Sequence, residues 1–117
     1  GGAALALLLA SRRDDIAQVQ TLAGNLSPRQ WVALHDLRPL TGSLEPLDER
    51  QRLAQVRQRH FVGSEDRVVP PPLLDRYRRA LGEARCVQSI VVPGARHGEG
   101  LEQAWRTWRN LPIACQP

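Results

Sequence analysis

GSEDRVVP (residues 63–70) and VVPGARHG (residues 91–98) decide the fold of this chain. Each stretch belongs to the end of an apolar run that is typical of a buried strand, and each then places one polar side chain in a loop. These side chains are Asp66 and His97. Ligands of an open parallel sheet collect beyond the carboxyl ends of its strands. We therefore expect Asp66 and His97 to lie together at that edge of a sheet.

The composition is that of one globular domain or a piece of one, with 117 residues of which 42% are apolar. The longest apolar run, Ala3 to Ala10, is too short to span a bilayer. It also lacks the basic leader and the small-residue cleavage site of a signal peptide. The sequence contains no Met, which favours a truncated or processed chain.

Sixteen Arg and no Lys give the chain a net charge of +4. The Arg residues are interleaved with acidic residues, as in Asp48-Glu49-Arg50 and Glu65-Asp66-Arg67, so no block of positive charge forms. We therefore expect no nucleic-acid partner.

Two cysteines, Cys86 and Cys115, stand apart in the sequence without the C-x-x-C spacing of a metal site. Cys86 opens an apolar run and is interpreted as a small buried residue, with a disulfide to Cys115 left open. Neither thiol indicates a compartment, and no metal or cofactor is expected.

Helical and strand-like segments alternate along the chain. The first, Ala3 to Arg12, is apolar nearly all round, which is typical of a helix buried within a larger fold. Later segments show helical spacing, β-branched runs and turn residues. The predicted segments are a strand at Val19–Ala23, a helix at Arg29–Leu37 capped by Ser27 with Pro28 in its first turn, a short helix at Asp48–Leu53, a strand at Arg59–Gly63, a helix from Pro70 to Leu81 closed by Gly82, a strand at Val87–Val92 and a helix from Leu101 to Leu111 stopped by Pro112.

This order predicts an α/β fold, because strands that alternate with helices pair in parallel through right-handed crossovers. We divide the single partial domain into three parts. Residues 1–25 hold the first helix and strand, residues 26–56 form an irregular excursion, and residues 57–117 contain the Asp66 and His97 segments. An excursion of this length is more often a lid or binding loop than a simple connection.

The chain resembles the C-terminal half of a serine-dependent α/β-hydrolase of the esterase, lipase or peptidase kind. The resemblance rests on GSED at residues 63–66 with Val69-Pro70, and on the strand end Val91-Val92-Pro93-Gly94 with His97-Gly98. In that family the catalytic residues run Ser, then Asp or Glu, then His along the chain. The resemblance implies an open, mostly parallel sheet with flanking helices.

The resemblance extends to the N-terminus. The family's nucleophile elbow, G-x-S-x-G, leads directly into a buried helix, and Gly1-Gly2 before Ala3 looks like the end of such an elbow. This alignment implies that the nucleophilic serine lies just upstream of Gly1. It also implies that the backbone N–H of Gly1 is one donor of the oxyanion hole.

The mechanism that the resemblance implies is acyl transfer on an ester, thioester or amide. His97 would act as the base and then the acid, while Asp66 would hold its tautomer. The substrate would be a small-molecule or peptide acyl compound. Arg67 and Arg96 near the site favour a carboxylate or phosphate group on it, although both also fit solvated loop charges.

Each assignment has an alternative. Asp66 could cap the helix that begins near Pro70, and Glu65 could be the acid instead. His97 could be a loop histidine that fixes a turn. The other polar or aromatic candidates are interpreted as structural, and they are His35, His60, Trp31, Trp105 and Trp108. For Trp31 the alternative is that it lines a substrate pocket from the lid-like excursion.

The internal serines are Ser11, Ser27, Ser43, Ser64 and Ser89. None of them has the sequence setting of a nucleophile elbow, so we expect the chain alone to be inactive. Its expected partner is a missing N-terminal half or a second copy at an open sheet edge. The alternative function is a non-catalytic α/β module that binds a protein.

Overall fold

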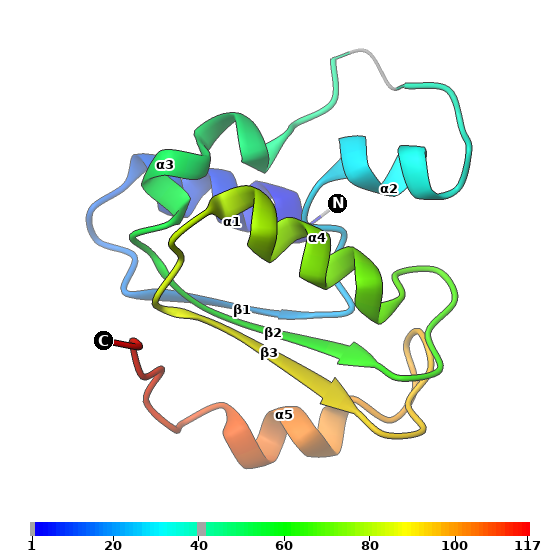
Figure 1. Ribbon diagram of the computed structural model, residues 1–117. Helices are drawn as coiled ribbons and strands as arrows, with labels where there is room; N and C mark the ends of the chain where they lie inside the picture. The colour runs from blue at the N-terminus through cyan, green and yellow to red at the C-terminus, as the bar shows by residue number, and fades with distance from the viewer. Residues whose placement is uncertain (1, 40–41) are drawn as a thin grey trace.

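The computed structural model describes residues 2–39 and 42–117, and its centre is a parallel sheet of three strands. The strands are β1 (Gln18–Leu22), β2 (Arg57–Gly63) and β3 (Val87–Val92), in the order β1-β2-β3. Both pairs are parallel, and all three carboxyl ends lie at the same edge of the sheet (Figure 1). The predicted α/β fold class is confirmed.

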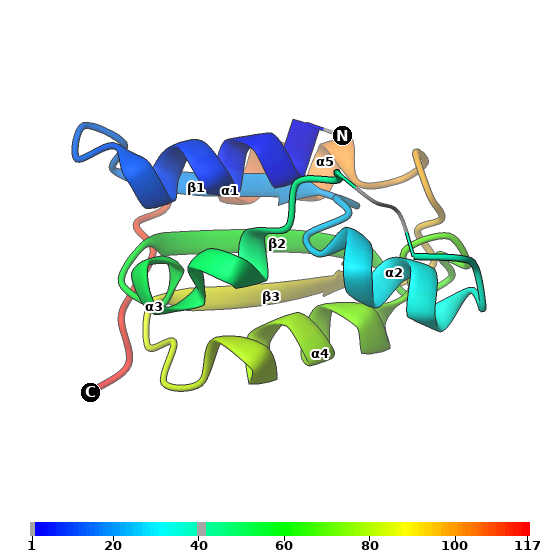
Figure 2. The same cartoon turned by 90° about the horizontal axis from the view of Figure 1, so that it is seen from above.

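Helices cover the two faces of the sheet unequally. Figures 1 and 2 show α1, α3 and α4 on one face, α2 near its carboxyl-end edge, and α5 alone on the opposite face. The N-terminal end of α1 lies at the carboxyl ends of the strands (Figure 2). The helices are α1 (Gly2–Arg12), α2 (Pro28–Leu34), α3 (Arg50–Leu53), α4 (Pro71–Leu81) and α5 (Glu102–Trp108), with a 3-10 turn, η1, at Pro46–Glu49.

The hydrophobic core lies between the sheet and the helices of the more covered face. Strand side chains alternate between faces, so alternate residues of each strand point into this core. Burying these aliphatic and aromatic side chains is the main driving force for folding here. The buried members are Leu7, Ala10, Val19, Leu26, Leu47, Leu53, Val62, Leu74, Tyr77, Leu81 and Val87.

Strand β3 has the predicted bounds, whereas several other ends differ. The second strand begins two residues earlier than predicted, at Arg57. Helix α2 was expected to reach Leu37 but ends at Leu34, because Asp36 adopts a positive φ of 53° that a right-handed helix excludes. The last helix ends at Trp108 and not at Leu111. Ser27 caps α2 as predicted, accepting a hydrogen bond from the Gln30 N–H.

A buried polar network joins β1, β2 and α4 inside the core. Gln58 donates its amide N–H to the Leu53 carbonyl, so its Oε1 accepts from both the Tyr77 hydroxyl (2.8 Å) and His60 Nε2 (2.8 Å). His60 Nδ1 is then the acceptor for the Thr21 hydroxyl at 2.6 Å. Burial lowers the pKa of His60 to about 3 and raises the pKa of Tyr77. Both side chains are therefore neutral, and the structural interpretation of His60 agrees with this packing.

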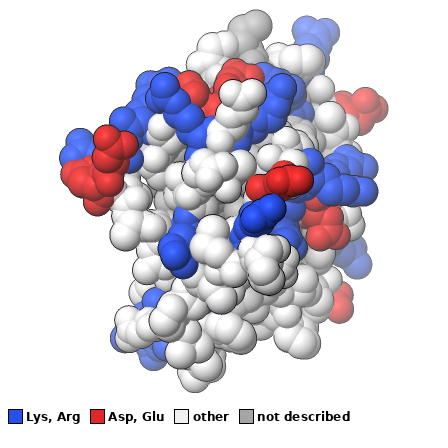
Figure 3. Space-filling view, turned by 60° about the vertical axis from the view of Figure 1, so that its left-hand side comes forward, with Lys and Arg blue, Asp and Glu red and all other residues white. Residues whose placement is uncertain are grey.

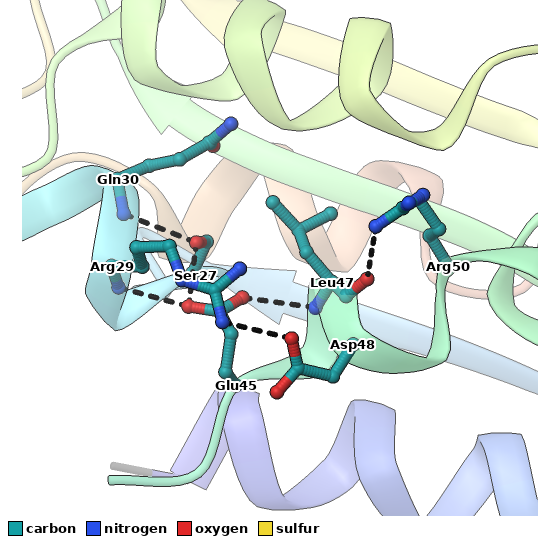
Figure 4. A network of polar contacts seen from close by, with 7 residues as sticks. All are labelled: Ser27, Arg29, Gln30, Glu45, Leu47, Asp48 and Arg50. Carbon is teal, nitrogen blue, oxygen red and sulfur yellow. Dashed lines mark hydrogen bonds and ion pairs between the residues drawn. The ribbon is translucent and has the colours of Figure 1, made fainter. Parts of the chain in front are cut away.

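Glu45 anchors the excursion at residues 26–56. Its buried carboxylate accepts hydrogen bonds from the Ser27 hydroxyl, the Arg29 N–H and the Leu47 N–H, each at 2.9 Å (Figure 4). These donors belong to the beginnings of α2 and η1, where helical N–H groups lack partners. One side chain thus fixes the starts of two elements.

The C-terminal segment is attached to the sheet by a disulfide and by arginines. Cys86 and Cys115 are bonded to each other, which resolves the alternative left open by the sequence. Arg59, fully buried in β2, donates to the carbonyls of Trp108 and Leu111 at 2.8 Å and of Pro112 at 3.0 Å. Its guanidinium also lies over the Trp108 ring, 5.6 Å from the centroid. Helix α5 itself buries no residue, and Trp108 keeps 38% of its surface exposed.

Basic and acidic side chains are mixed on the surface. Figure 3 shows them side by side on one face, next to a broad uncharged area. Exposed ion pairs join Arg13 to Asp15 and Arg29 to Asp48. Among the described residues, no helix has the length and apolar character needed to cross a bilayer.

Candidate active site

Asp66 lies in the loop after β2 and is held by its own turn. Its side chain is fully buried, and its Oδ1 accepts hydrogen bonds from the N–H groups of Val68 and Val69, both at 2.8 Å. A buried carboxylate is stable only when such donors satisfy it. The predicted alternative, a cap on the following helix, does not describe this contact, because Pro70 is the residue at the N-cap of α4.

The loop after β3 approaches the loop after β2 at Gly63. A Cβ atom at Gly63 would lie 2.1 Å from the Ala95 carbonyl oxygen, so only glycine permits this approach. Backbone hydrogen bonds then join the two loops, from Ser64 N–H to the Val92 carbonyl and from Glu65 N–H to the Ala95 carbonyl. The Ser64 hydroxyl also accepts from the Gly94 N–H. These contacts fix the segment that leads to His97.

Asp66 and His97 meet between these loops. His97 Nδ1 lies 2.9 Å from Asp66 Oδ2, and 44% of the His97 side chain remains exposed whereas that of Asp66 is inaccessible. An ionised carboxylate can only accept a hydrogen bond, so Nδ1 carries the hydrogen of this contact, and in the neutral ring Nε2 is then the nitrogen with the free lone pair. Glu65, the alternative acid, is exposed. An ionised acid that fixes the tautomer of an accessible imidazole is suited to general acid–base chemistry.

His97 borders a cleft of about 500 Å³ at the carboxyl ends of the strands. The N-terminal turn of α1 forms another part of its lining, through Gly2, Ala3 and Ala6. A Cβ atom at Gly24, just after β1, would lie 2.5 Å from the Ala3 Cβ, so this glycine lets α1 approach the strand end. Gly1, the expected oxyanion-hole donor, lies outside the described residues.

Trp31 and His35 also make polar contacts at the site. From the sequence, His35 is interpreted as structural and Trp31 as a core or surface anchor, with a place in the substrate pocket as the alternative for Trp31. Trp31 lines the cleft, and its indole Nε1–H donates to the Val68 carbonyl at 2.9 Å. His35 Nε2 lies 2.8 Å from the same oxygen. Trp31 lies on α2 and His35 is the C-cap residue of that helix, so their spacing of four residues puts both on one side of its C-terminal end. The place of Trp31 in the lid-like excursion was a signal for the cleft, but nothing in the sequence indicates the shared contact with Val68, which is 33 to 37 residues away.

The remaining predicted positions lie apart from this pair or point to solvent. Arg67 and Arg96 are exposed in the two loops, and neither contributes a hydrogen bond to Asp66 or His97. Within residues 2–39 and 42–117, no three His, Cys, Asp or Glu side chains gather as a possible metal site.

No protein-family model and no curated protein matches the sequence of this chain. Solved structures do resemble it. A PHB depolymerase in complex with an R3HB trimer superposes with a TM-score of 0.55 and 19% sequence identity. The match covers 83% of this chain but 36% of the depolymerase chain, so this chain spans about a third of that neighbour's length. At this identity the likeness concerns the fold, and the chain therefore has an α/β-hydrolase-like fold.

Proposed function

We propose that this chain supplies the acid and the base of a serine hydrolase that cleaves an ester, thioester or amide. The observation that carries the proposal is the hydrogen bond of 2.9 Å between His97 Nδ1 and Asp66 Oδ2 beside an open cleft. The two residues come from the ends of neighbouring parallel strands, where sheets of this kind bind ligands. The α/β-hydrolase-like fold supports the same reaction class.

The proposed nucleophile is a serine directly N-terminal to Gly1. Support comes from the cleft, because His97 and the first turn of α1 line it together. In this proposal the serine before Gly1 reaches the same cleft as the imidazole. In the same proposal the Gly1 N–H stabilises the oxyanion, since the first N–H groups of a helix have no partner within it.

The chemistry requires one proton to move twice. His97 Nε2 takes the proton of the serine hydroxyl as its oxygen attacks the acyl carbon, and the imidazolium is stabilised by Asp66. The tetrahedral intermediate collapses when Nε2 returns that proton to the leaving group. Water then attacks the acyl-enzyme by the same route, which releases the acid and restores the serine. Asp66 stays ionised throughout.

The partner that we propose for this chain is the remaining half of the fold. Strand β1 is bonded to β2 on one side and forms one edge of the described sheet. Leucines of α1 and β1 are unusually exposed, with exposed fractions of 50% for Leu5, 45% for Leu9 and 43% for Leu22. Leu22 points to the face opposite α1, so both flanks of the edge are apolar. An added strand would cover them.

The same edge favours one alternative function, a non-catalytic module that binds another protein there. The two functions differ in chemistry. Binding through β1 needs neither Asp66 nor His97, whereas hydrolysis needs both.

The test is labelling with a fluorophosphonate, which reacts with an activated serine. We expect the protein translated from the complete reading frame to be labelled at one serine immediately before Gly1, and the 117-residue chain to remain unlabelled. Replacing His97 with Ala or Asp66 with Asn in the complete protein should lower the labelling rate by about three to four orders of magnitude.

Glu65→Gln is the matched control and should label normally, because Glu65 is exposed beside Asp66. Labelling of Ser64 or another internal serine in the 117-residue chain would refute the proposed nucleophile. Full labelling in the Asp66→Asn and His97→Ala proteins would refute the acid and base.

A further inference from the structure

One peptide group connects helix α2 with Asp66. The N–H of Val69 donates to Asp66 Oδ1 at 2.8 Å. The carbonyl of Val68 belongs to the same peptide and is contacted by Trp31 Nε1 at 2.9 Å and by His35 Nε2 at 2.8 Å. A peptide group is planar, so fixing its carbonyl also fixes the direction of its N–H.

The protonation of His35 follows from this geometry. A carbonyl only accepts, so His35 Nε2 carries a proton, as does the indole nitrogen. The rings of Trp31 and His35 are 4.7 Å apart and tilted by 52°, so they contact each other as they converge on one oxygen. Two donors on one carbonyl polarise the peptide and strengthen the bond that its N–H makes.

Apolar packing holds only part of the turn at residues 66–69. Arg67 is exposed, and Val68 keeps 43% of its surface accessible to solvent. Val69, the next residue, is buried, so apolar packing holds the side of the peptide that carries the N–H, whereas the Val68 side chain on the carbonyl side is largely solvated. The donors from Trp31 on α2 and from His35 at its C-cap are the polar contacts to the Val68 carbonyl.

We propose that Trp31 and His35 are positioning residues for Asp66. They fix the Val68–Val69 peptide, which in turn holds Asp66 Oδ1 and leaves Oδ2 directed at His97 Nδ1. This inference rests on the proposed function, in which Asp66 sets the tautomer of His97. In this inference the excursion at residues 26–56 helps to orient Asp66.

The experiment measures the ring ¹⁵N chemical shifts of histidine in the full chain, since these report which nitrogen holds the proton. We expect His97 to be protonated on Nδ1. In the double variant Trp31→Phe with His35→Leu, both donors are lost while the apolar bulk remains. The Nδ1–H preference of His97 should then be lost, and the ring should move toward the Nε2–H form that a free imidazole favours.

Two variants separate positioning from simple packing. Trp31→Phe combined with His35→Gln restores one N–H donor and should recover the His97 tautomer in part. Trp105→Phe changes a tryptophan on α5, away from the loop that carries Asp66, and should leave the His97 tautomer unaltered. His60, bonded to Gln58 and Thr21 in the core, is the internal reference for an intact fold.

The outcomes distinguish this inference from the proposed function. If Asp66→Asn leaves the His97 tautomer unchanged, the Asp66–His97 pair fails and both proposals fall. If Asp66→Asn shifts it but the double variant does not, the positioning inference alone is overturned. If the double variant also disturbs the His60 signals, the single variants Trp31→Phe and His35→Leu are measured instead, because each keeps one of the two donors. A wild-type His97 tautomer in both single variants overturns the inference.

Discussion

Gly63 is the residue at which the Asp66 and His97 loops come together. The space that a side chain would need is already occupied by the Ala95 backbone, 2.1 Å from the position of a Cβ atom. The alignment of Asp66 with His97 therefore depends on a residue that takes no part in the chemistry.

The variant Gly63→Ala should move the loop after β3 and weaken the site. We expect a loss of about 1–3 kcal/mol in the free energy of unfolding, as for other overpacked positions. Urea unfolding measures this loss. The His97 ring signals should also shift, because its loop starts at the displaced segment.

Gly2→Ala is the matched control for this substitution. Nothing lies within 4 Å of a Cβ atom there, so alanine should leave the stability unchanged or raise it slightly. An unaltered unfolding curve for Gly63→Ala would show that the loops can separate without cost.

At this scale the sequence was informative about Asp66 and His97, because each stands in a recognisable loop after a strand. It was uninformative about the Val68 carbonyl. A bond from the Trp31 side chain to a backbone oxygen 37 residues away leaves no local pattern. The same is true of the contact between Gly63 and Ala95.

Among the elements, β1, β2 and α4 are coupled by the His60 network, which makes stability depend on pH. The pKa of His60 is about 3 in the folded chain, below its usual value of 6.5. The contribution of neutral His60 is therefore complete above about pH 6.5 and is lost as the pH falls from there toward 3. We expect a loss of about 2 kcal/mol between pH 7 and pH 5 from this group.

The measurement is the unfolding free energy at a series of pH values. Carboxylates also titrate in acid, so the same series in His60→Gln isolates the histidine. The variant should show a shallower slope between pH 6.5 and pH 5. Equal slopes in the two proteins would mean that His60 does not titrate with unfolding.

The disulfide is a second link between elements, from the start of β3 to the C-terminal segment. It joins residues 29 positions apart. Closing a loop of this size restricts the unfolded chain and contributes about 3–4 kcal/mol. We expect Cys86→Ala with Cys115→Ala to lower the unfolding free energy by about that amount.

Addition of a thiol reductant should destabilise the native chain to the same extent and leave the double alanine variant unaffected. Arg57 and Arg59 still hold carbonyls of the tail in that variant. Equal stability of the oxidised and reduced chains would show that these arginines hold the C-terminal segment without help from the disulfide.

Element types were largely predictable, and element ends were less so. Val87–Val92 is dense in β-branched residues, which made β3 unambiguous. The end of α2 at Leu34 depends on Asp36 and its positive φ, which helical periodicity does not report. Pro112 marked a limit for α5, yet the helix ends earlier, at Trp108, whose carbonyl accepts a hydrogen bond from Arg59.

On the scale of the whole molecule, the edge formed by β1 should make the chain self-associate. Leu5, Leu9 and Leu22 are exposed on its two flanks, and unpaired strand edges favour pairing with another chain. We expect a concentration-dependent shift to dimers or larger species in sedimentation velocity. The double variant Leu5→Arg with Leu9→Arg should reduce that shift.

Leu37→Arg is the matched control. Leu37 is 52% exposed but follows α2, outside the flanks of β1, so its replacement should not change the association. A chain that stays monomeric at all concentrations and unfolds cooperatively would favour the non-catalytic module over a part of a larger sheet.

The sequence by itself determined the alternation of strands and helices and the two loops that carry Asp66 and His97, because these depend on local periodicity and on turn residues. Only the tertiary structure decided the bond between Cys86 and Cys115 and the cleft that His97 shares with α1. It also decided the contacts of Trp31 and His35 with the Val68 carbonyl. The physical reason is separation along the chain. These contacts join residues dozens of positions apart, and they exist only once packing of the core has brought their elements together.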